Sequence, residues 1–185
     1  MKNTVQPELI SLRDLSEQDA PLLRDYWFRS PEGFIESLGV DFSKMPSEAE
    51  FERGLINKCR ENASRPSSKL NALIILYDEK PVGFHTMTPV VEGDYGIFHA
   101  HVWDTQLRGR SLGVHTYPKA CRIFLDRFDL KRILFKTPKQ NLGAIRVKEK
   151  LGIPLIGEEV INFGIYREGT LSQVYELTRP HADRL

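Results

Sequence analysis

The sequence predicts an α+β fold in which helices cover both faces of one mixed, mostly antiparallel central sheet of about six to seven strands. Two observations predict it. The middle of the chain carries three strand-like runs joined by tight turns, and helical patterns both precede these runs and alternate with later strands. The 185 residues contain no internal repeat and no dividing linker, so we expect residues 1–185 to form a single domain.

The first half of the chain is predicted to contain one strand followed by helices. Residues 8–15 alternate between apolar and polar side chains, as a half-buried strand does. A capping-box pattern opens each of two helices, expected over residues 16–28 and 47–62. A short helical segment is expected between them, over residues 34–38.

Three strands should follow over residues 72–77, 82–90 and 95–103, separated by turns rich in Asp, Gly and Pro. Because consecutive strands joined by tight turns pair side by side, these runs predict an antiparallel meander.

The last part of the chain alternates helices and strands. Its pattern predicts a helix over residues 109–127, a strand over 132–137 and a second helix over 142–151. Residues 158–166 and 173–178 then predict a closing pair of strands.

Composition and charge exclude several classes of protein. Lys and Arg total 26 and Asp and Glu total 25, and no basic run marks a face for nucleic acid. No apolar run is long enough to span a bilayer, and the first residues lack the apolar core of a signal peptide, so we expect neither a membrane partner nor export. Cys59 and Cys121 offer neither a disulfide framework nor a metal-knuckle spacing, which favours a cytoplasmic protein.

A turn of small and basic residues lies where the third strand of the meander leads into the next helix. Small side chains let the backbone approach a ligand, and the free N–H groups of a first helical turn favour an anion such as a pyrophosphate. Alone, such a turn is as often a solvated loop as an anion site. The pattern is neither a P-loop nor a dinucleotide fingerprint. The turn consists of Arg108, Gly109, Arg110, Ser111, Leu112 and Gly113.

A second segment, residues 141–153, follows the next predicted strand and reads Asn-Leu-Gly-Ala-Ile-Arg-Val-Lys-Glu-Lys-Leu-Gly-Ile. With the first, it resembles the GNAT superfamily of N-acyltransferases. In that family an Arg/Gln-x-x-Gly-x-Gly/Ala turn holds the CoA pyrophosphate, and a later helix has the pattern Asn-x-x-Ala/Ser…Glu-Lys-Leu-Gly-Phe. The opening residues 12–20 are also similar to the family, so that the resemblance covers about residues 9–178. It implies a GNAT-like fold with acetyl-CoA as cosubstrate and no metal.

Two positions depart from the family pattern. Ser111 replaces the first glycine of the turn, a change that is compatible with helical φ/ψ angles; its hydroxyl could bond a phosphate, or the serine could be a tolerated small residue. Lys148 stands where many relatives carry a Tyr that reprotonates the departing CoA thiolate, so no general acid is carried over and solvent could serve. In this detail the helix is most similar to the branch that acetylates ribosomal-protein N-termini, although that branch often has Ser where this chain has Ala144.

The resemblance implies direct transfer of an acetyl group to a primary amine, without an acyl-enzyme. It places contacts to the thioester and pantetheine on the main chain of Val102 and Trp103, and further cofactor contacts on the turn that begins at Arg108 and on Asn141. The acceptor is either a small-molecule amine or a peptide N-terminus, and the protein a monomer or a homodimer. The alternative is a non-catalytic acyl-CoA-binding or regulatory module of the same fold.

Two histidines on the strand before the turn are the candidate catalytic residues. His99 and His101 are two residues apart and therefore share one face of the strand. Imidazole titrates near neutrality, which suits a base, and some arylalkylamine acetyltransferases use histidines on this strand. Each could instead be a hydrogen-bonded side chain at the sheet surface. The spacing also occurs in metal sites, but no third ligand is apparent.

The residues that bind the acceptor are less clearly marked. Glu158 or Glu159 could reach the acceptor site. Four aromatic residues of the early helices could line its pocket, with core packing as the alternative. These are Trp27, Phe28, Phe34 and Phe42.

Overall fold

One mixed sheet organises the molecule. The computed structural model describes residues 4–65, 69–162 and 164–185, and within them seven strands pair in the order β1-β2-β3-β4-β5-β7-β6. The strands are β1 (Ile10–Asp14), β2 (Ala72–Tyr77), β3 (Lys80–Val91), β4 (Tyr95–Val102), β5 (Arg132–Pro138), β6 (Leu155–Ile161) and β7 (Thr170–Thr178). Neighbouring strands are antiparallel except β4 and β5, which run parallel.

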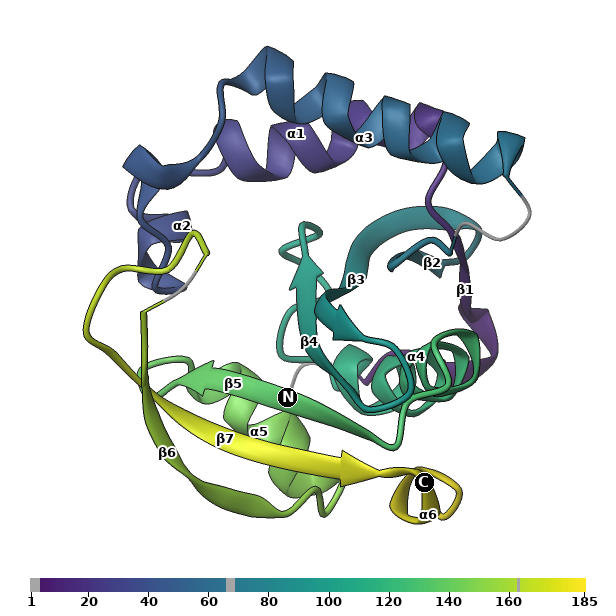
Figure 1. Cartoon of the computed structure of the whole chain (residues 1–185), viewed down its shortest axis with the longest axis vertical. Helices are drawn as coiled ribbons and strands as arrows, with labels where there is room; N and C mark the ends of the chain where they lie inside the picture. The colour runs from purple at the N-terminus through teal and green to yellow at the C-terminus, as the bar shows by residue number, and fades with distance from the viewer. Residues whose placement is uncertain (1–3, 66–68, 163) are drawn as a thin grey trace.

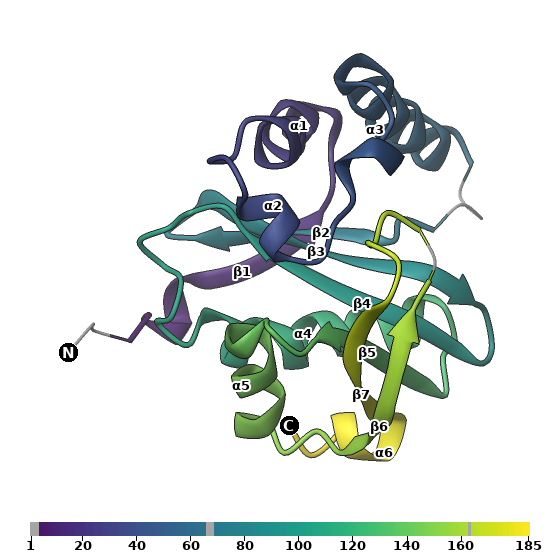
Figure 2. The same ribbon diagram turned by 90° about the vertical axis from the view of Figure 1, so that its left-hand side faces the viewer.

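Helices cover both faces of this sheet, as predicted (Figures 1 and 2). One face carries α1 (Ala20–Phe28), α2 (Phe34–Ser37) and α3 (Glu48–Ser64). The opposite face carries α4 (Leu112–Arg127), α5 (Leu142–Lys150) and the short α6 (Arg179–Ala182). Three 3-10 turns complete the structure, η1 (Pro7–Leu9), η2 (Glu17–Asp19) and η3 (Phe42–Lys44). The predicted α+β class with a mostly antiparallel sheet is therefore confirmed.

Two of the element boundaries that differ from the prediction bear on the cavity described below. The helix expected from residue 109 begins at Leu112, because Gly109 and Ser111 have φ angles of 76° and 67°, which a right-handed helix cannot contain. The closing strand expected over residues 158–166 is instead β6, which ends at Ile161. Tyr166 lies beyond it and forms an isolated antiparallel bridge with Val40, near α2.

The strands β4 and β5 separate soon after they begin. Their parallel register runs from the pair Tyr95 and Arg132 to the pair Ile97 and Leu134, and continues no further in the part of the chain that the structure describes. Beyond Ile97, β4 keeps its pairing with β3 on one side only. The sheet therefore opens at its centre, on the side of β4 that faces β5 (Figure 1).

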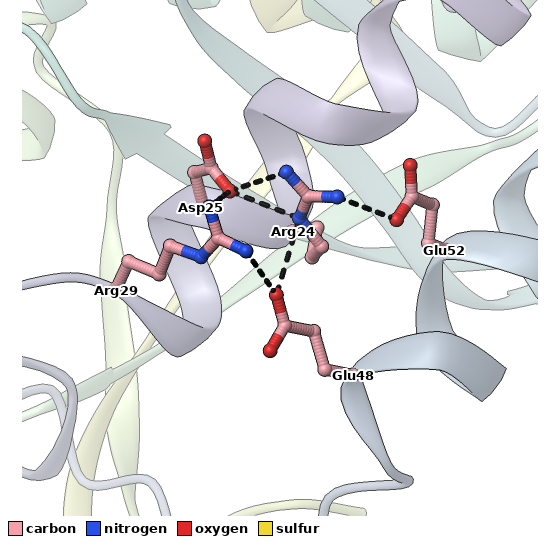
Figure 3. A network of polar contacts seen from close by, with 5 residues as sticks. All are labelled: Arg24, Asp25, Arg29, Glu48 and Glu52. Carbon is pink, nitrogen blue, oxygen red and sulfur yellow. Dashed lines mark hydrogen bonds and ion pairs between the residues drawn. The ribbon is translucent and has the colours of Figure 1, made fainter.

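Ion pairs join the two long helices that cover one side of this opening. Arg24 of α1 reaches Glu52 of α3 at 2.7 Å, and Arg29 reaches Glu48 at 2.9 Å (Figure 3). Asp25 lies between the two guanidinium groups, 2.7 Å from Arg24 and 3.4 Å from Arg29. This network holds α1 against α3 and pairs the carboxylates of Asp25, Glu48 and Glu52 with arginines.

Candidate active site

A cavity of about 860 Å³ lies where β4 and β5 separate. On one face of the sheet it is lined by side chains of α1, α2 and α3, and on the other by the first turn of α4 and by α5. The ends of β3, β4 and β5 lie between these two parts. The cavity therefore has two arms on opposite faces, which we call the α4–α5 arm and the α1–α3 arm.

Most of the residues predicted to hold the cofactor line the α4–α5 arm or the junction of the two arms. They are Val102, Arg108, Gly109, Ser111, Leu112, Gly113 and Asn141. Two predicted residues do not line the cavity. Arg110 is tied to the N-terminal segment through its carbonyl, which accepts a hydrogen bond from the Val5 N–H at 3.1 Å. The N–H of Trp103 donates to the Val82 carbonyl at 3.0 Å, which leaves it no free donor for a thioester.

Val102 presents its backbone to the gap between β4 and β5. Trp103 is hydrogen-bonded to β3, and hydrogen-bonded and non-bonded positions alternate along an antiparallel pair. Val102, opposite Gly83, is therefore at a non-bonded position, and its N–H and carbonyl point away from β3. The carbonyl accepts a hydrogen bond from Nε of Arg108 at 2.8 Å. The N–H lies at the edge where a carbonyl group could be polarised.

The first turn of α4 leaves its N–H groups without a side-chain cap. Its N-cap residue, Ser111, has φ 67° and ψ 15° and no side-chain cap hydrogen bond. From the sequence, Ser111 is compatible with helical angles, but the residue adopts the left-handed conformation that glycine adopts freely. Such a conformation costs an L-residue about 1–2 kcal/mol. The uncapped N–H groups and the helix dipole together favour an anion.

Gly113 allows α4 to approach α5 closely. A Cβ at this position would lie 3.0 Å from Cγ2 of Val147 and 3.4 Å from Cε1 of Tyr117. On the facing helix, Asn141 is the N-cap of α5, and its side chain accepts a hydrogen bond from the Ala144 N–H at 3.1 Å. This bond explains why Asn is separated from Ala by two residues in the motif.

The charge of the lining is entirely positive. No Asp or Glu lines the cavity in the ranges that the structure describes. The cationic side chains of the lining are Lys58, Arg108, Lys136, Arg146, Lys148 and Lys150. Three of the six, Arg146, Lys148 and Lys150, belong to α5, so the α4–α5 arm suits a polyanion. The guanidinium of Arg108 lies instead over the Phe34 ring on the side of the α1–α3 arm, 4.2 Å from the ring centroid, and Lys136 pairs with Glu159.

His99 is held by hydrogen bonds at both ring nitrogens. Nε2 lies 2.7 Å from the Thr88 carbonyl, which can only accept, so Nε2 carries the proton. Nδ1 of the neutral ring then accepts from the Tyr166 hydroxyl at 3.1 Å. Burial lowers the pKa of His99 and raises that of Tyr166 to about 12. His99 can therefore take up a proton from the cavity only through Tyr166.

His101 keeps one ring nitrogen unbonded. Nδ1 lies 3.0 Å from the hydroxyl of Tyr26, and no described residue bonds Nε2. The ring stacks on Phe84 at 4.7 Å and meets the edge of Trp27 at 4.9 Å. Burial lowers the pKa of His101 to about 3, so the ring is neutral near pH 7. When Nδ1 donates to Tyr26, Nε2 is an acceptor.

In the sequence, Lys148 is notable only because it stands where many relatives carry a Tyr. In the structure its side chain is buried and lines the cavity. Lys148 is only 3% exposed, and its Nζ donates a hydrogen bond to Oγ1 of Thr137 at 2.7 Å. Three aromatic rings surround Nζ, with centroids at 5.8 to 6.0 Å. No carboxylate pairs with it in the described ranges, and burial lowers its pKa to about 7. The rings belong to Tyr117, Phe135 and Tyr175.

The structure separates the predicted acceptor residues into two groups. Trp27 and Phe34 line the α1–α3 arm, whereas Phe28 and Phe42 pack edge to face at 5.7 Å outside the lining. The two glutamates suggested for the acceptor site do not line the cavity. They pair with lysines across β5 and β6: Glu158 with Lys139 at 2.7 Å and Glu159 with Lys136 at 2.5 Å.

Metal and thiol chemistry find little support among the described residues. No group of three or more His, Cys, Asp or Glu among them could hold a metal ion. Cys59 and Cys121 are free and buried, and burial raises the pKa of both thiols. No helix in these ranges is long and apolar enough to cross a membrane.

A family model described as the Acetyltransferase (GNAT) family matches residues 32–153. This chain belongs to that family. It is an acyl-CoA-dependent acetyltransferase, and acetyl-CoA is its cosubstrate. The match covers the helices α2 to α5 and the strands between them, and thus the whole α4–α5 arm, whereas α1, which lines part of the α1–α3 arm, lies outside it. A search of curated proteins found no significant match.

Solved structures of the same fold include several acetyltransferases. An aminoglycoside acetyltransferase, AAC(6')-Ib, in complex with coenzyme A has a TM-score of 0.70 and 16% identity, over 95% of this chain and 98% of that chain. Spermidine N-acetyltransferase from Vibrio cholerae, in complex with CoA and spermine, has a TM-score of 0.72 and 13% identity, over 95% and 98%. Ribosomal-protein-S5-alanine acetyltransferase from Vibrio fischeri has a TM-score of 0.70 and 13% identity, over 92% and 93%.

Replacing Gly113 by Ala tests the role of the α4–α5 contact in cofactor binding. The added Cβ would press on Val147 and displace the first turn of α4, so we expect the Kd for acetyl-CoA to rise about tenfold, which corresponds to 1.4 kcal/mol. Titration calorimetry measures it. Gly54→Ala is the matched control, because Gly54 lies in α3 outside the cavity lining and a Cβ there meets nothing within 4 Å, so the Kd should stay within about twofold. Equal affinities for the two variants would contradict the assignment.

Proposed function

We propose that this acetyltransferase moves an acetyl group from acetyl-CoA directly to a primary amine, on a small molecule or a protein N-terminus. One observation carries the proposal: the cavity joins a cationic arm at the start of α4 to an aromatic arm under α1 and α3, through the gap between β4 and β5. A donor and an acceptor can thus meet from opposite faces of the sheet. Acetyl-CoA supplies the activated acyl thioester when bound.

The α4–α5 arm is proposed to hold the donor. Its uncapped N–H groups at Leu112 and Gly113 suit a pyrophosphate, and Arg146 and Lys150 of α5 add positive charge. The Val102 N–H, at the edge of β4, is placed to polarise the thioester carbonyl. Binding of this kind holds the reacting carbon at the junction of the two arms and lowers the entropic part of the barrier.

His101 is proposed as the group that receives the proton of the attacking amine. Its Nε2 has no hydrogen-bond partner among the described residues, and Tyr26 fixes the ring through Nδ1. His99 and Tyr166 form a second route, in which the phenol would take the proton as it passes its own to Nδ1 of His99. The geometry favours His101, because a proton reaches its nitrogen in one transfer rather than two.

Lys148 is proposed as the proton donor to the leaving sulfur. Contacts with three aromatic rings and with Thr137 offset part of the cost of burying the Lys148 ammonium, but no carboxylate pairs with it among the described residues, so an apolar side chain would suit a purely structural role better. Its burial among aromatic rings holds its pKa near neutrality, where it can both carry and release a proton at physiological pH. Thr137 fixes the direction of Nζ. Lys148 would thus take the role that many relatives give to a tyrosine.

Two acceptor classes remain compatible with the proposed reaction. The sequence of α5, with Lys148 in place of Tyr, supports a protein N-terminus, as in the ribosomal-protein branch. The aromatic α1–α3 arm supports a small molecule or the first residues of a peptide. The alternative, a non-catalytic acyl-CoA-binding module, predicts binding without turnover.

The proposed reaction is tested by measuring binding and turnover on the same protein. At a hundred times its Kd, acetyl-CoA should stabilise the fold by about 2.7 kcal/mol, seen as a rise in Tm. Thiol release with a panel of primary amines should show turnover. His101→Ala should keep the Tm shift and lower kcat by about a hundredfold. Acetyl-CoA binding with no thiol release from any amine would instead support the non-catalytic module.

Replacing Lys148 by Met separates a catalytic role from a structural one. Because the proton donor must be protonated, kcat of the wild type should fall as the pH rises through about 7. Lys148→Met should lose this limb of the pH profile and lower kcat by about a hundredfold, since general acids contribute that much. Its Tm should rise, because the uncompensated cation is gone.

Lys148→Tyr is the rescue variant, and it should recover part of the lost rate without restoring the limb near pH 7. An unchanged kcat and pH profile in Lys148→Met would remove Lys148 from the reaction.

A further inference from the structure

The α1–α3 arm of the cavity offers an acceptor aromatic and apolar surroundings. Its walls come from α1, from the loop before α3 and from α3 itself. Six residues represent them: Leu23, Tyr26, Trp27, Phe34, Met45 and Phe51. Phe84 forms the floor on β3, where it stacks on His101. A substrate in this arm gains free energy mainly by burying apolar surface.

One polar group of this arm is a cation, the Arg108 guanidinium, which lies over Phe34 and donates from Nε to the Val102 carbonyl. Other polar groups of the arm bond one another. The Tyr26 hydroxyl lies against His101, and the Tyr166 hydroxyl against His99. Lys58, at the far end, donates to the side-chain carbonyl of Asn71, and burial lowers its pKa. None of these groups carries a negative charge near pH 7, since burial raises the pKa of both tyrosines.

Three carboxylates of α1 and α3 are neutralised outside the cavity. Asp25, Glu48 and Glu52 belong to the α1–α3 helices but form ion pairs with Arg24 and Arg29 (Figure 3), and none of them lines the cavity. The rim near β6 is similar, because Glu158 and Glu159 pair with lysines. An ammonium group that entered the arm would meet no carboxylate among the described residues that line it.

Charge burial then decides which amines can react. An ammonium ion moved from water into an apolar site without a counter-ion loses several kcal/mol of solvation. The reacting amine avoids this cost by entering as the neutral base. A second amino group on the same molecule stays protonated near pH 7, because alkylamines resemble lysine, with pKa values of about 10. It would be buried as a cation beside Lys58 or excluded.

We infer that the acceptor is a primary amine on an apolar, preferably aromatic, body with a single amino group, and that this site rejects polyamines and aminoglycosides. The inference rests on the proposed amine acetyltransferase function and names its substrate class. It distinguishes this protein from solved relatives of the same fold that bind spermine or aminoglycosides. A peptide N-terminus with an apolar first side chain belongs to the accepted class.

Matched amines test this selectivity directly. Hexylamine and hexamethylenediamine have the same carbon chain and differ by one amino group, and phenylpropylamine adds an aromatic body. With the wild-type protein and acetyl-CoA, kcat/KM should be highest for phenylpropylamine, and hexylamine should exceed hexamethylenediamine by about a hundredfold, as expected for an unpaired buried charge. Spermidine and kanamycin should give the lowest rates.

A carboxylate introduced into the lining should reverse part of this selectivity. Met45→Glu places a negative charge in the α1–α3 arm, and the ratio of hexylamine to hexamethylenediamine should fall about tenfold. Met45→Gln has the same shape without the charge and should leave the ratio unchanged. The wild-type panel does not depend on either variant folding.

The outcomes separate this inference from the proposed function. If hexamethylenediamine or spermidine reacts as fast as hexylamine, the enzyme is an amine acetyltransferase and only the substrate class is wrong. If acetyl-CoA binds but no amine in the panel releases thiol, the proposed function fails and the inference fails with it. Turnover with the aromatic amine alone supports both.

Discussion

The separation of β4 from β5 is the constraint on which the rest of the site depends. If β4 and β5 stayed paired past Ile97 and Leu134, the backbone groups of β4 that face β5 would be hydrogen-bonded along the strand. Because it stops there, the backbone of Val102 faces a gap, and a cavity can pass from one face of the sheet to the other. A register shift in β3 between Met87 and Val90 lies beside this region, and bulges of this kind bend the strands that contain them.

Charge and apolar surface are then divided between the two sides of the gap. The α4–α5 arm gathers cationic side chains and uncapped N–H groups, and the α1–α3 arm gathers aromatic rings. His101 and Lys148 line the cavity where these environments meet, both with pKa values lowered by burial. The same absence of carboxylates, within the described residues, that favours a polyanionic donor also limits the acceptor. The lack of carboxylates in the described lining therefore accounts both for the preference for an anionic cofactor and for the inferred substrate class.

Local sequence signals predicted most of the fold because its elements are marked by local interactions. The capping box at Ser47 and Glu50 opens α3, and the Asn141 cap opens α5. The turn from Arg108 to Gly113 was recognised because its residue types, and the order of elements around it, are themselves local properties. These features depend on residues three or four positions apart, which sequence reasoning handles well.

Features that depend on tertiary contacts could not be predicted from local sequence signals. Burial of Lys148 depends on rings from β5, β7 and α4, and Tyr166 reaches His99 only because the chain turns after β6 toward Val40. The left-handed angle of Ser111 is set by the packing of the turn rather than by the preference of serine. Trp103 is unavailable as a donor because of the register between β3 and β4, which no sequence pattern in this region indicates.

Hydrogen exchange measured by mass spectrometry, with and without acetyl-CoA, tests most directly whether the gap between β4 and β5 receives the donor. The account predicts slower exchange in two separate segments, at the end of β4 around Val102 and in the first turn of α4, while β1 and β2 are unchanged. Protection of the α4 turn alone would mean that the nucleotide end binds but that the acyl arm does not enter the gap. That result would contradict the central claim, because the two arms of the cavity would then not join a donor to an acceptor.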